Sequence, residues 1–430
     1  MTSYVADLHL HSRFSRASSP QMSIPNLIVW GKRKGIHLLG TGDFTDPDWL
    51  GEIEDHLEQD DCGFLKPREE TEIRFLLTTE LETLFQVRGE MHRIHLLITA
   101  PHLEAVKSLR QNLQEVTDLS SGGLPRSGVS AAELVERVLE ASPQSLAIPA
   151  HIWIPVTGLY GSHFGFDSLQ DCFEGMAAEI HAVETGLSSD PGMCWRVREL
   201  DSRQIVSFSD AHSLSSLGRE FTIFEGEFSY AGVCQALKSS GEARIAGTVE
   251  YCSELGKYYF NGHRECKVTK SPIETRFEGK GCPVCRKEIT VGTFHRCLEM
   301  ADRAAEDLDV VQEGGWIQSR TLQKPPYRRM IPLREIIAAS YGITGKESQT
   351  VEKIYEEALA CGSSEREILL EMSEPDLRCF VDHRVSEGII RVRETRYRIS
   401  PGYDGVYGHL DIFEGRESVE LMQMKLFEHH

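Results

Sequence analysis

The sequence lacks any apolar run near the roughly 18 residues that a membrane-spanning helix requires, so we expect no action at a membrane. The stretch from Met1 to Ser12 lacks the basic and apolar regions of a secretory signal. The 11 cysteines are odd in number and spread from Cys62 to Cys379, which suits a reducing compartment better than a disulfide framework. A cytoplasmic protein is therefore expected.

Basic residues are scarce, with 46 Lys and Arg against 66 Asp and Glu in 430 residues and a net charge of −20. This balance argues against a protein that coats nucleic acid, because phosphate contacts need Lys and Arg. A solvated acidic surface is the plain interpretation, and acidic residues gathered at metal sites are the alternative. Residues 251–300 depart from the average, since nine Lys and Arg there outnumber six Asp and Glu.

The first 250 residues alternate short apolar runs with amphipathic stretches, which predicts an α/β fold with a parallel sheet. The number of such units favours a barrel over an open sheet. The expected strands cover residues 4–10, 37–42, 74–81, 93–99, 145–150, 177–184, 204–209 and 221–224. The expected helices cover residues 24–34, 103–116, 131–141 and 230–239.

The pattern changes at residue 251, where Gly, Cys, Lys and Arg become frequent. Helical patterns follow at 298–308, 348–361 and 364–372, and short strand-like runs at 389–392 and 397–399. We expect a catalytic barrel at 1–250, a small unit stabilised by a bound metal at 251–300, a mainly helical unit at 301–420 and a tail at 421–430.

Histidine and acidic residues recur at the ends of the expected strands. His9 and His11 alternate along the first strand, so they face one side and can reach the same ion. Imidazole and carboxylate ligands together suit Zn, Mn or Fe, and a shared carboxylate such as Glu80 can bridge two ions. The carboxyl ends of barrel strands are where chemistry is assembled. The further candidates are Asp43, His95, His151, Asp210 and His212.

Each of these residues has a plainer interpretation when taken alone. His95 and His151 are compatible with core histidines, and Asp43 with a cap of the following helix. The recurrence of ligand-type residues at strand ends of one α/β unit favours a metal site over these separate explanations.

The motifs Asp7-Leu-His9-Leu-His11-Ser12, Pro149-Ala-His151 and Ser209-Asp210-Ala-His212 resemble those of the polymerase and histidinol phosphatase (PHP) family. The resemblance covers residues 1–250 and implies a distorted (β/α)7-type PHP barrel with catalytic metals. It implies that one ion is held by His9, His11, Glu80 and Asp210, and a second by Glu80, His95 and His151.

The sequence departs from the family's three-metal pattern. Phe44 follows Asp43 where the family has histidine, and residues 13–18 contain no further histidine. The resemblance therefore implies two divalent ions, Zn, Mn or Mg. His212 is left to donate a proton or bind phosphate, and Asp210, His212 and Asp43 are the expected catalytic residues.

The spacing from His263 and Cys266 to Cys282 and Cys285 is that of a four-ligand structural zinc site. A reduced Cys-x-x-Cys with a nearby Cys by chance is the alternative, and Cys252, His295 and Cys297 are rival ligands. A unit of this size has almost no core, so the metal is expected to stabilise it. The basic residues expected to contact DNA phosphates are Lys267, Lys270, Arg286 and Lys287, with Arg276 and Lys280 beside them.

The barrel, the ribbon and the segment Pro401-Gly-Tyr-Asp-Gly-Val-Tyr-Gly408 together resemble the endonuclease Q family. The resemblance implies a DNA repair nuclease that nicks on the 5′ side of uracil, hypoxanthine, xanthine and abasic sites. His263 stands where the family has cysteine, a change that preserves zinc chemistry. We expect Arg219 to hold a phosphate oxygen, and Tyr160, Phe164 and Phe166 to stack on DNA or else to pack within their loop.

Two other functions are compatible with the barrel motifs. A small-molecule phosphoesterase would leave the ribbon and the helical unit unexplained. A scaffold with an inactive barrel conflicts with the complete set of ligands for two metals.

The segment Gln423-Met-Lys-Leu426-Phe427 is similar to the Gln-x-x-Leu-Phe peptide with which bacterial DNA enzymes bind the sliding clamp. The alternative is an amphipathic helix end in which Leu421, Met424 and Phe427 pack on the chain's own core.

Overall fold

The computed structural model describes residues 2–119 and 124–413, and its centre is a 13-stranded sheet. The strands are β1 (Thr2–Asp7), β2 (Leu38–Gly40), β3 (Leu57–Gln59), β4 (Leu65–Pro67), β5 (Arg74–Val87), β6 (Glu90–Ala100), β7 (Arg126–Ser127), β8 (Leu146–Pro149), β9 (Ala182–Glu184), β10 (Gln204–Val206), β11 (Phe221–Gly226), β12 (Arg244–Tyr251), β13 (Asn261–His263), β14 (Val268–Lys270), β15 (Val310–Glu313), β16 (Trp316–Ser319), β17 (Tyr327–Met330), β18 (Arg398–Ser400) and β19 (His409–Asp411).

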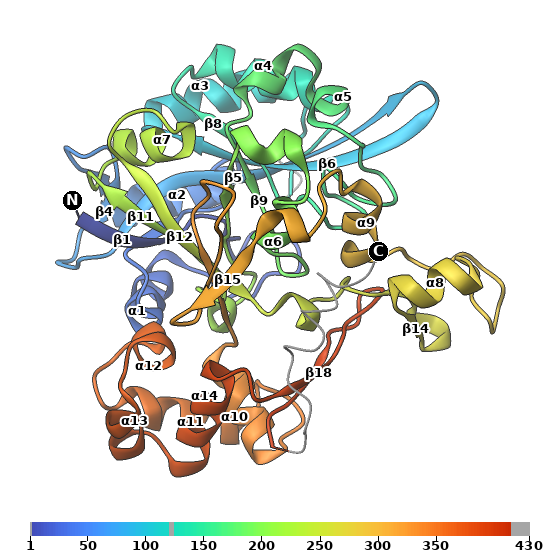
Figure 1. The fold of residues 1–430 in the computed structure, drawn as a ribbon. Helices are drawn as coiled ribbons and strands as arrows, with labels where there is room; N and C mark the ends of the chain where they lie inside the picture. The colour runs from blue at the N-terminus through green and yellow to red at the C-terminus, as the bar shows by residue number, and fades with distance from the viewer. Residues whose placement is uncertain (1, 120–123, 414–430) are drawn as a thin grey trace.

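Helices cover this sheet and form a separate layer at one end of the molecule. Figure 1 shows α3, α4 and α7 at the end of the molecule opposite to α10 to α14. The helices are α1 (Ile24–Lys34), α2 (Pro47–His56), α3 (Leu103–Leu113), α4 (Ala131–Ala141), α5 (Leu169–Phe173), α6 (Pro191–Cys194), α7 (Tyr230–Lys238), α8 (Pro272–Glu278), α9 (Thr293–Met300), α10 (Leu333–Tyr341), α11 (Gln349–Leu359), α12 (Glu365–Leu370), α13 (Glu374–Phe380) and α14 (His383–Arg393). In the parts of the chain that the structure describes, none of them is long and apolar enough to cross a membrane.

Local sequence accounts for the helices that were expected with the same bounds, α1 and α4. In α4 the Ser130 hydroxyl accepts the backbone N–H of Glu133, which satisfies one of the free donors at the helix start. Leu134, Val135 and Val138 recur on one face and are buried.

The α/β class is confirmed, but the sheet is mixed where the alternation of elements predicts a parallel one. β1 pairs in parallel with β2, and β2 with β5, whereas β6 is antiparallel to both β5 and β8. The cause is a long β5–β6 hairpin that turns at Arg88 and Gly89, both with positive φ. Such a two-residue turn matches the twist of an antiparallel pair.

Two expected elements in the second half of the chain are wrong. Residues 389–392 lie inside α14, where Val385 and Ile389 are buried one turn apart, so their apolar run serves a helix. The expected helix at 298–308 is divided, because α9 ends at Met300 and Ala301 is extended.

Residues 310–330 extend the sheet of the first unit instead of belonging to a helical domain that begins at 301. β17 pairs in parallel with β12, and β15 and β16 follow it outward. The helical layer therefore begins at α10, with Leu333.

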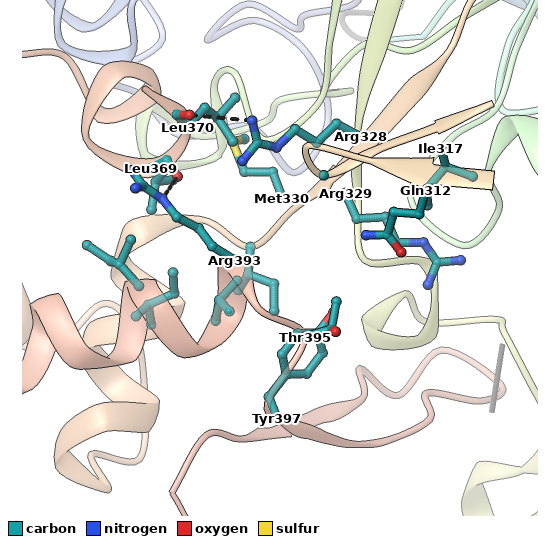
Figure 2. A pocket seen from close by; sticks show the side chains of 15 residues that line it. Gln312, Ile317, Arg328, Arg329, Met330, Leu369, Leu370, Arg393, Thr395 and Tyr397 are labelled. Carbon is teal, nitrogen blue, oxygen red and sulfur yellow. Dashed lines mark hydrogen bonds between the residues drawn. The ribbon is translucent and has the colours of Figure 1, made fainter. Parts of the chain in front are cut away.

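A small cavity of about 40 Å³ lies where this layer meets β17 (Figure 2). Arg393 donates hydrogen bonds to the carbonyl oxygens of Ile368, Leu369 and Met372, at the end of α12. The guanidinium thereby caps the last turn of that helix. The lining contains no His, Cys, Asp or Glu, so this cavity has no metal-ligand chemistry.

Candidate metal centre

The side chains of the histidines and acids singled out in the sequence lie close together. His9 and His11 follow β1, His151 follows β8, and Asp210 follows β10. His95 lies within β6, inside a strand as expected, whereas Glu80 lies within β5 and not at the end of a strand as expected. Because residues two apart share a face and Glu82 pairs with His95 across the hairpin, Glu80 still points to the same side as His95.

The first ligand group consists of His9, His11 and Glu80, with Asp210 beside it. Nε2 of His9 and Nε2 of His11 each lie 3.5 Å from a Glu80 oxygen. The same two nitrogens lie 3.7 Å and 3.2 Å from Oδ1 of Asp210. Both are buried and have no hydrogen-bond partner among the described residues, so they are suited to bind a divalent ion.

The second ligand group consists of Glu80, His95 and His151. Oε1 of Glu80 lies 2.7 Å from Nδ1 of His95 and 3.0 Å from Nε2 of His151. Glu80 belongs to both groups, so its carboxylate would be shared by the two positions if both were occupied.

A second layer of acids orients the imidazole rings. Asp43 accepts the Ser12 N–H at 2.6 Å and lies 3.2 Å from Nδ1 of His11, which turns Nε2 of that ring toward the first group. Asp43, expected as a catalytic residue, is therefore placed to position His11.

Sequence reasoning missed two members of this layer, Glu184 and Glu82. Glu184 contacts Nδ1 of His9, and Glu82 lies 3.0 Å from Nε2 of His95. Glu184 carries the same signal as the expected ligands, an acidic residue at the end of a buried apolar strand, and could have been found by it.

Three of the site residues have strained backbones. Asp43, His151 and Asp210 have φ values of 43°, 33° and 47°, a region that side chains other than glycine rarely adopt. Each follows a strand at the metal centre, and such strain is retained where the surrounding structure holds functional groups in place.

The electrostatics of the centre require positive charge. Burial lowers the pKa of His9, but Glu184 and Glu80 outweigh burial and hold it well above its usual value. Burial raises the pKa of Glu80, and the neighbouring His95 and His9 reverse this and hold it well below its usual value. Divalent ions bound by these residues would supply that positive charge.

His212 lies at the open rim of the centre. Its Nδ1 is 3.1 Å from the Asp210 carbonyl oxygen, its ring centroid is 4.2 Å from that of His11, and its side chain is 38% exposed. Ligand atoms of His11, Asp210 and His212 form a third group within 4.8 Å of one another. The expectation of two ions stays a prediction.

Arg219 does not present its guanidinium to a phosphate as expected. Its side chain is buried, and Nε donates to the Ser209 carbonyl at 2.9 Å while an Nη donates to the Asp210 carbonyl at 3.3 Å. Arg219 therefore positions the strained backbone that carries Asp210.

Of the two alternatives for the 160–166 loop, stacking on DNA or packing within the protein, the structure favours packing for two of the three aromatic residues. Tyr160 is fully buried and donates to Glu199 at 2.6 Å, and Phe166 stacks at 3.8 Å between ring centroids on His92. Both rings are therefore buried in the protein and not presented at its surface. Phe164 is half-buried and stays a candidate.

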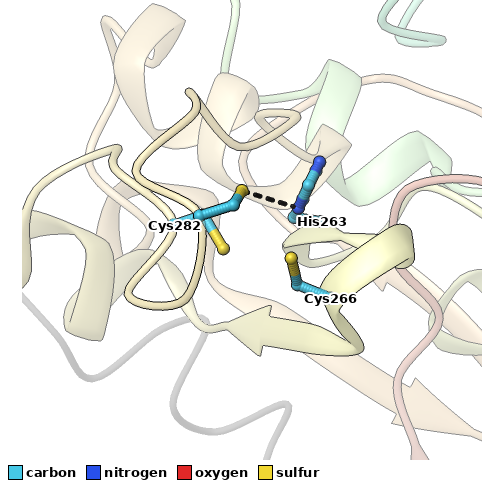
Figure 3. Close-up of side chains that lie close together, drawn as sticks. His263, Cys266 and Cys282 are labelled. Carbon is cyan, nitrogen blue, oxygen red and sulfur yellow. Dashed lines mark hydrogen bonds between the residues drawn. The ribbon is translucent and has the colours of Figure 1, made fainter.

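The zinc-type ligands of the 251–300 segment come together as their spacing predicts. One ligand atom from each of His263, Cys266, Cys282 and Cys285 lies within 4.8 Å of the others. Figure 3 shows three of these side chains facing one another. Backbone N–H groups of Cys285 and Val284 lower the pKa of the Cys282 thiol to about 6, which favours the thiolate that binds metal.

The basic residues beside this cluster divide into two classes. Lys270 is buried and its ammonium group faces the carbonyl oxygens of Gly279 and Gly281, so it is not a phosphate contact as expected. Lys267, Arg286 and Lys287 are exposed. The tail residues Gln423, Leu426 and Phe427 lie outside the described residues.

Some known proteins are similar to one part of this chain, and others are similar to nearly all of it. Residues 332–396 match the family model of the MJ0043 C-terminal domain. The uncharacterized protein YqxK of Bacillus subtilis is 28% identical over 429 residues, which cover 95% of this chain and 100% of that protein. The uncharacterized protein MJ0043 of Methanocaldococcus jannaschii is 38% identical over 152 residues, 35% of this chain and 16% of that protein.

Two solved structures are similar over nearly the whole chain. The lesion-specific endonuclease PfuEndoQ from Pyrococcus furiosus is 30% identical with a TM-score of 0.80, covering 98% of this chain and 99% of that one. Endonuclease Q in complex with a 27-mer duplex substrate that has an abasic lesion at the active site is 29% identical, with a TM-score of 0.83 and coverage of 98% and 100%. The chain therefore belongs to the endonuclease Q family and is a metal-dependent DNA repair endonuclease.

Proposed function

We propose that the protein cleaves the phosphodiester bond on the 5′ side of deaminated bases, namely uracil, hypoxanthine and xanthine, and of abasic sites. The observation that carries the proposal is the position of Glu80, whose carboxylate lies between two groups of imidazole ligands. The abasic duplex in the related endonuclease Q complex supports the choice of substrate.

His9, His11, Glu80 and Asp210 would hold one divalent ion, and Glu80, His95 and His151 would hold a second. When bound, such ions activate water and stabilise the leaving oxygen of a phosphodiester. His212, at the exposed rim, exchanges a proton with the reacting oxygens. Deaminated bases pair poorly, so their removal from the stack costs less than that of a normal base.

The segment 251–300 is a zinc ribbon held by His263, Cys266, Cys282 and Cys285. With four protein ligands the site is closed, which is typical of structural zinc. The exposed Lys267, Arg286 and Lys287 contact DNA phosphates and orient the duplex without reading its sequence.

The test uses labelled duplexes that each carry one uracil, hypoxanthine, xanthine or abasic site, an undamaged duplex and a small phosphate ester, with Mn, Mg or Zn added. A nick on the 5′ side of the damaged nucleotide alone supports the proposal. Hydrolysis of the ester without nicking would show a small-molecule phosphoesterase instead. His151→Ala should lose activity, and His163→Ala, an exposed histidine outside the ligand groups, should keep it.

A further inference from the structure

The loop between β18 and β19, residues 401–408, is fastened to the segment that follows β12. The N–H of Gly402 donates to the Glu254 carbonyl, and the N–H of Gly408 donates to the Leu255 carbonyl, both at 2.9 Å. Figure 1 shows the β18 strand reaching from the helical layer toward β14. The loop therefore brings the end of the described chain to the first unit in a defined position.

Cations from three parts of the chain surround one residue of this loop, Tyr407. The ammonium groups of Lys257 and Lys346 lie 4.8 Å and 5.6 Å from its ring centroid. Burial alone would raise the pKa of the phenol, but Arg219, followed by the two ammonium groups, reverses this and lowers it. Tyr407 nevertheless remains 42% exposed, so the group is open to a ligand.

This group has positive charge that the chain itself only partly neutralises. Lys346 is paired with Glu335 at 2.5 Å. Lys257 is exposed, and no salt bridge to it exists among the described residues. In a chain with a net charge of −20, an exposed cation that no carboxylate of the described residues pairs with, beside a phenol donor, is suited to bind an anion.

The group is also connected to the metal centre. Arg219, whose charge lowers the pKa of Tyr407, also donates a hydrogen bond to the carbonyl oxygen of the metal ligand Asp210. The group and the metal centre therefore both lie within the electrostatic reach of Arg219.

We propose that Lys257, Tyr407 and Lys346 form a phosphate subsite that holds a DNA backbone phosphate neighbouring the one that is cleaved. Lys257 supplies the free charge, the Tyr407 hydroxyl donates a hydrogen bond, and Lys346 adds charge from the helical layer. The subsite gives the C-terminal part of the chain a direct share in substrate binding. This inference rests on the proposed nuclease function.

The test places a single neutral methylphosphonate at each phosphate that flanks the lesion and measures single-turnover nicking. With the wild type, the modification at one flanking phosphate should slow nicking by about tenfold, the equivalent of one charge-assisted hydrogen bond. With Lys257→Ala or Tyr407→Phe, the unmodified duplex should already be nicked more slowly, and the same modification should have little further effect. The salt dependence of binding by Lys257→Ala should also weaken by about one phosphate contact.

Lys353→Ala is the matched control, because Lys353 is an exposed lysine of the helical layer paired with Glu357. It should respond to every methylphosphonate as the wild type does. If the wild type nicks but Lys257→Ala remains equally sensitive at every phosphate, the subsite is overturned. If the wild type nicks no damaged duplex, the proposed function itself fails, and the subsite with it.

Discussion

Both carboxylate oxygens of Glu184 lie 3.0 Å from Nδ1 of His9, and one of them accepts the backbone N–H of His151 at 2.9 Å. Glu184 thus contacts one residue from each of the two ligand groups without being a member of either. It fixes the ring of His9 and the strained backbone of His151 together, which couples the geometry of both metal positions.

Glu184→Gln should weaken metal binding about 10- to 100-fold, because the amide keeps the shape but loses the charge that orients His9. Metal content after dialysis against graded chelator measures this without reference to activity. Glu225→Gln is the control, since Glu225 lies at the surface with Arg244. Equal metal retention by both variants would contradict the role of Glu184.

Asp210→Asn should abolish nicking and leave DNA affinity largely unchanged. The change removes the carboxylate that lies 3.2 Å from Nε2 of His11, while phosphate contacts come from other residues. Asn is preferred to Ala because Asp210 has a φ of 47°, which Asn tolerates and Ala does not. Single-turnover nicking and equilibrium binding on one abasic duplex measure the two effects, and residual turnover above a few per cent of wild type would remove Asp210 from the ligand set.

Much of the metal centre could be predicted because its signal is local. A histidine or an acid directly after a short apolar run is visible in the sequence, and His9, His11, His151 and Asp210 all follow that pattern. Such a pattern does not show which way a side chain points. Asp43 points toward His11, and Arg219 points toward backbone carbonyl oxygens.

The errors come from contacts between distant parts of the chain. Phe166 looks like a loop aromatic, but His92 on the β6 strand covers it. The strands at 310–330 join the main sheet because β17 pairs with β12. No pattern within residues 301–330 reveals this pairing. Burial and sheet partners are decided by tertiary packing, which overrides local preference.

Cys282→Ser combined with Cys285→Ser should release one zinc ion per chain and unfold the 251–300 segment. The ribbon has few buried apolar side chains, so the metal provides much of its folding free energy. The barrel should persist, because most of its buried apolar side chains come from outside the 251–300 segment. Zinc analysis together with near-ultraviolet circular dichroism measures the two effects, and Cys62→Ser, an exposed cysteine away from the cluster, is the control. Unchanged zinc content would show that the ribbon assignment is wrong.

Glu250→Gln should stabilise the protein more at high pH than at low pH. Burial raises the pKa of Glu250 from its usual 4.5 to about 8. Between these values the folded state keeps a proton that the unfolded state has released, so wild-type stability falls as pH rises through this window. The Gln side chain has no proton to release, so the stability of the variant should not fall in this way.

Urea denaturation at about pH 5.5 and about pH 8.5 measures the effect. The variant's gain in unfolding free energy over the wild type should be larger at pH 8.5 than at pH 5.5. The difference should be at least about 1.4 kcal/mol, the value of one pKa unit. Glu313→Gln, on an exposed residue, should show no such growth. The same gain at both pH values would mean that Glu250 is ionised in the folded protein throughout.

The clamp peptide Gln423-Met-Lys-Leu426-Phe427 stays a prediction from the sequence. In such a peptide the amide makes polar contacts at the rim of a cleft on the clamp, and Leu and Phe fill an apolar pocket. Burying Leu426 and Phe427 should contribute roughly 1.5–3 kcal/mol each before ordering costs, which makes micromolar affinity realistic. Calorimetry of the whole protein with a bacterial sliding clamp, compared with a Leu426→Ala, Phe427→Ala variant, measures this. If the wild type does not bind, or if both proteins bind equally, the prediction of a clamp-binding peptide is wrong.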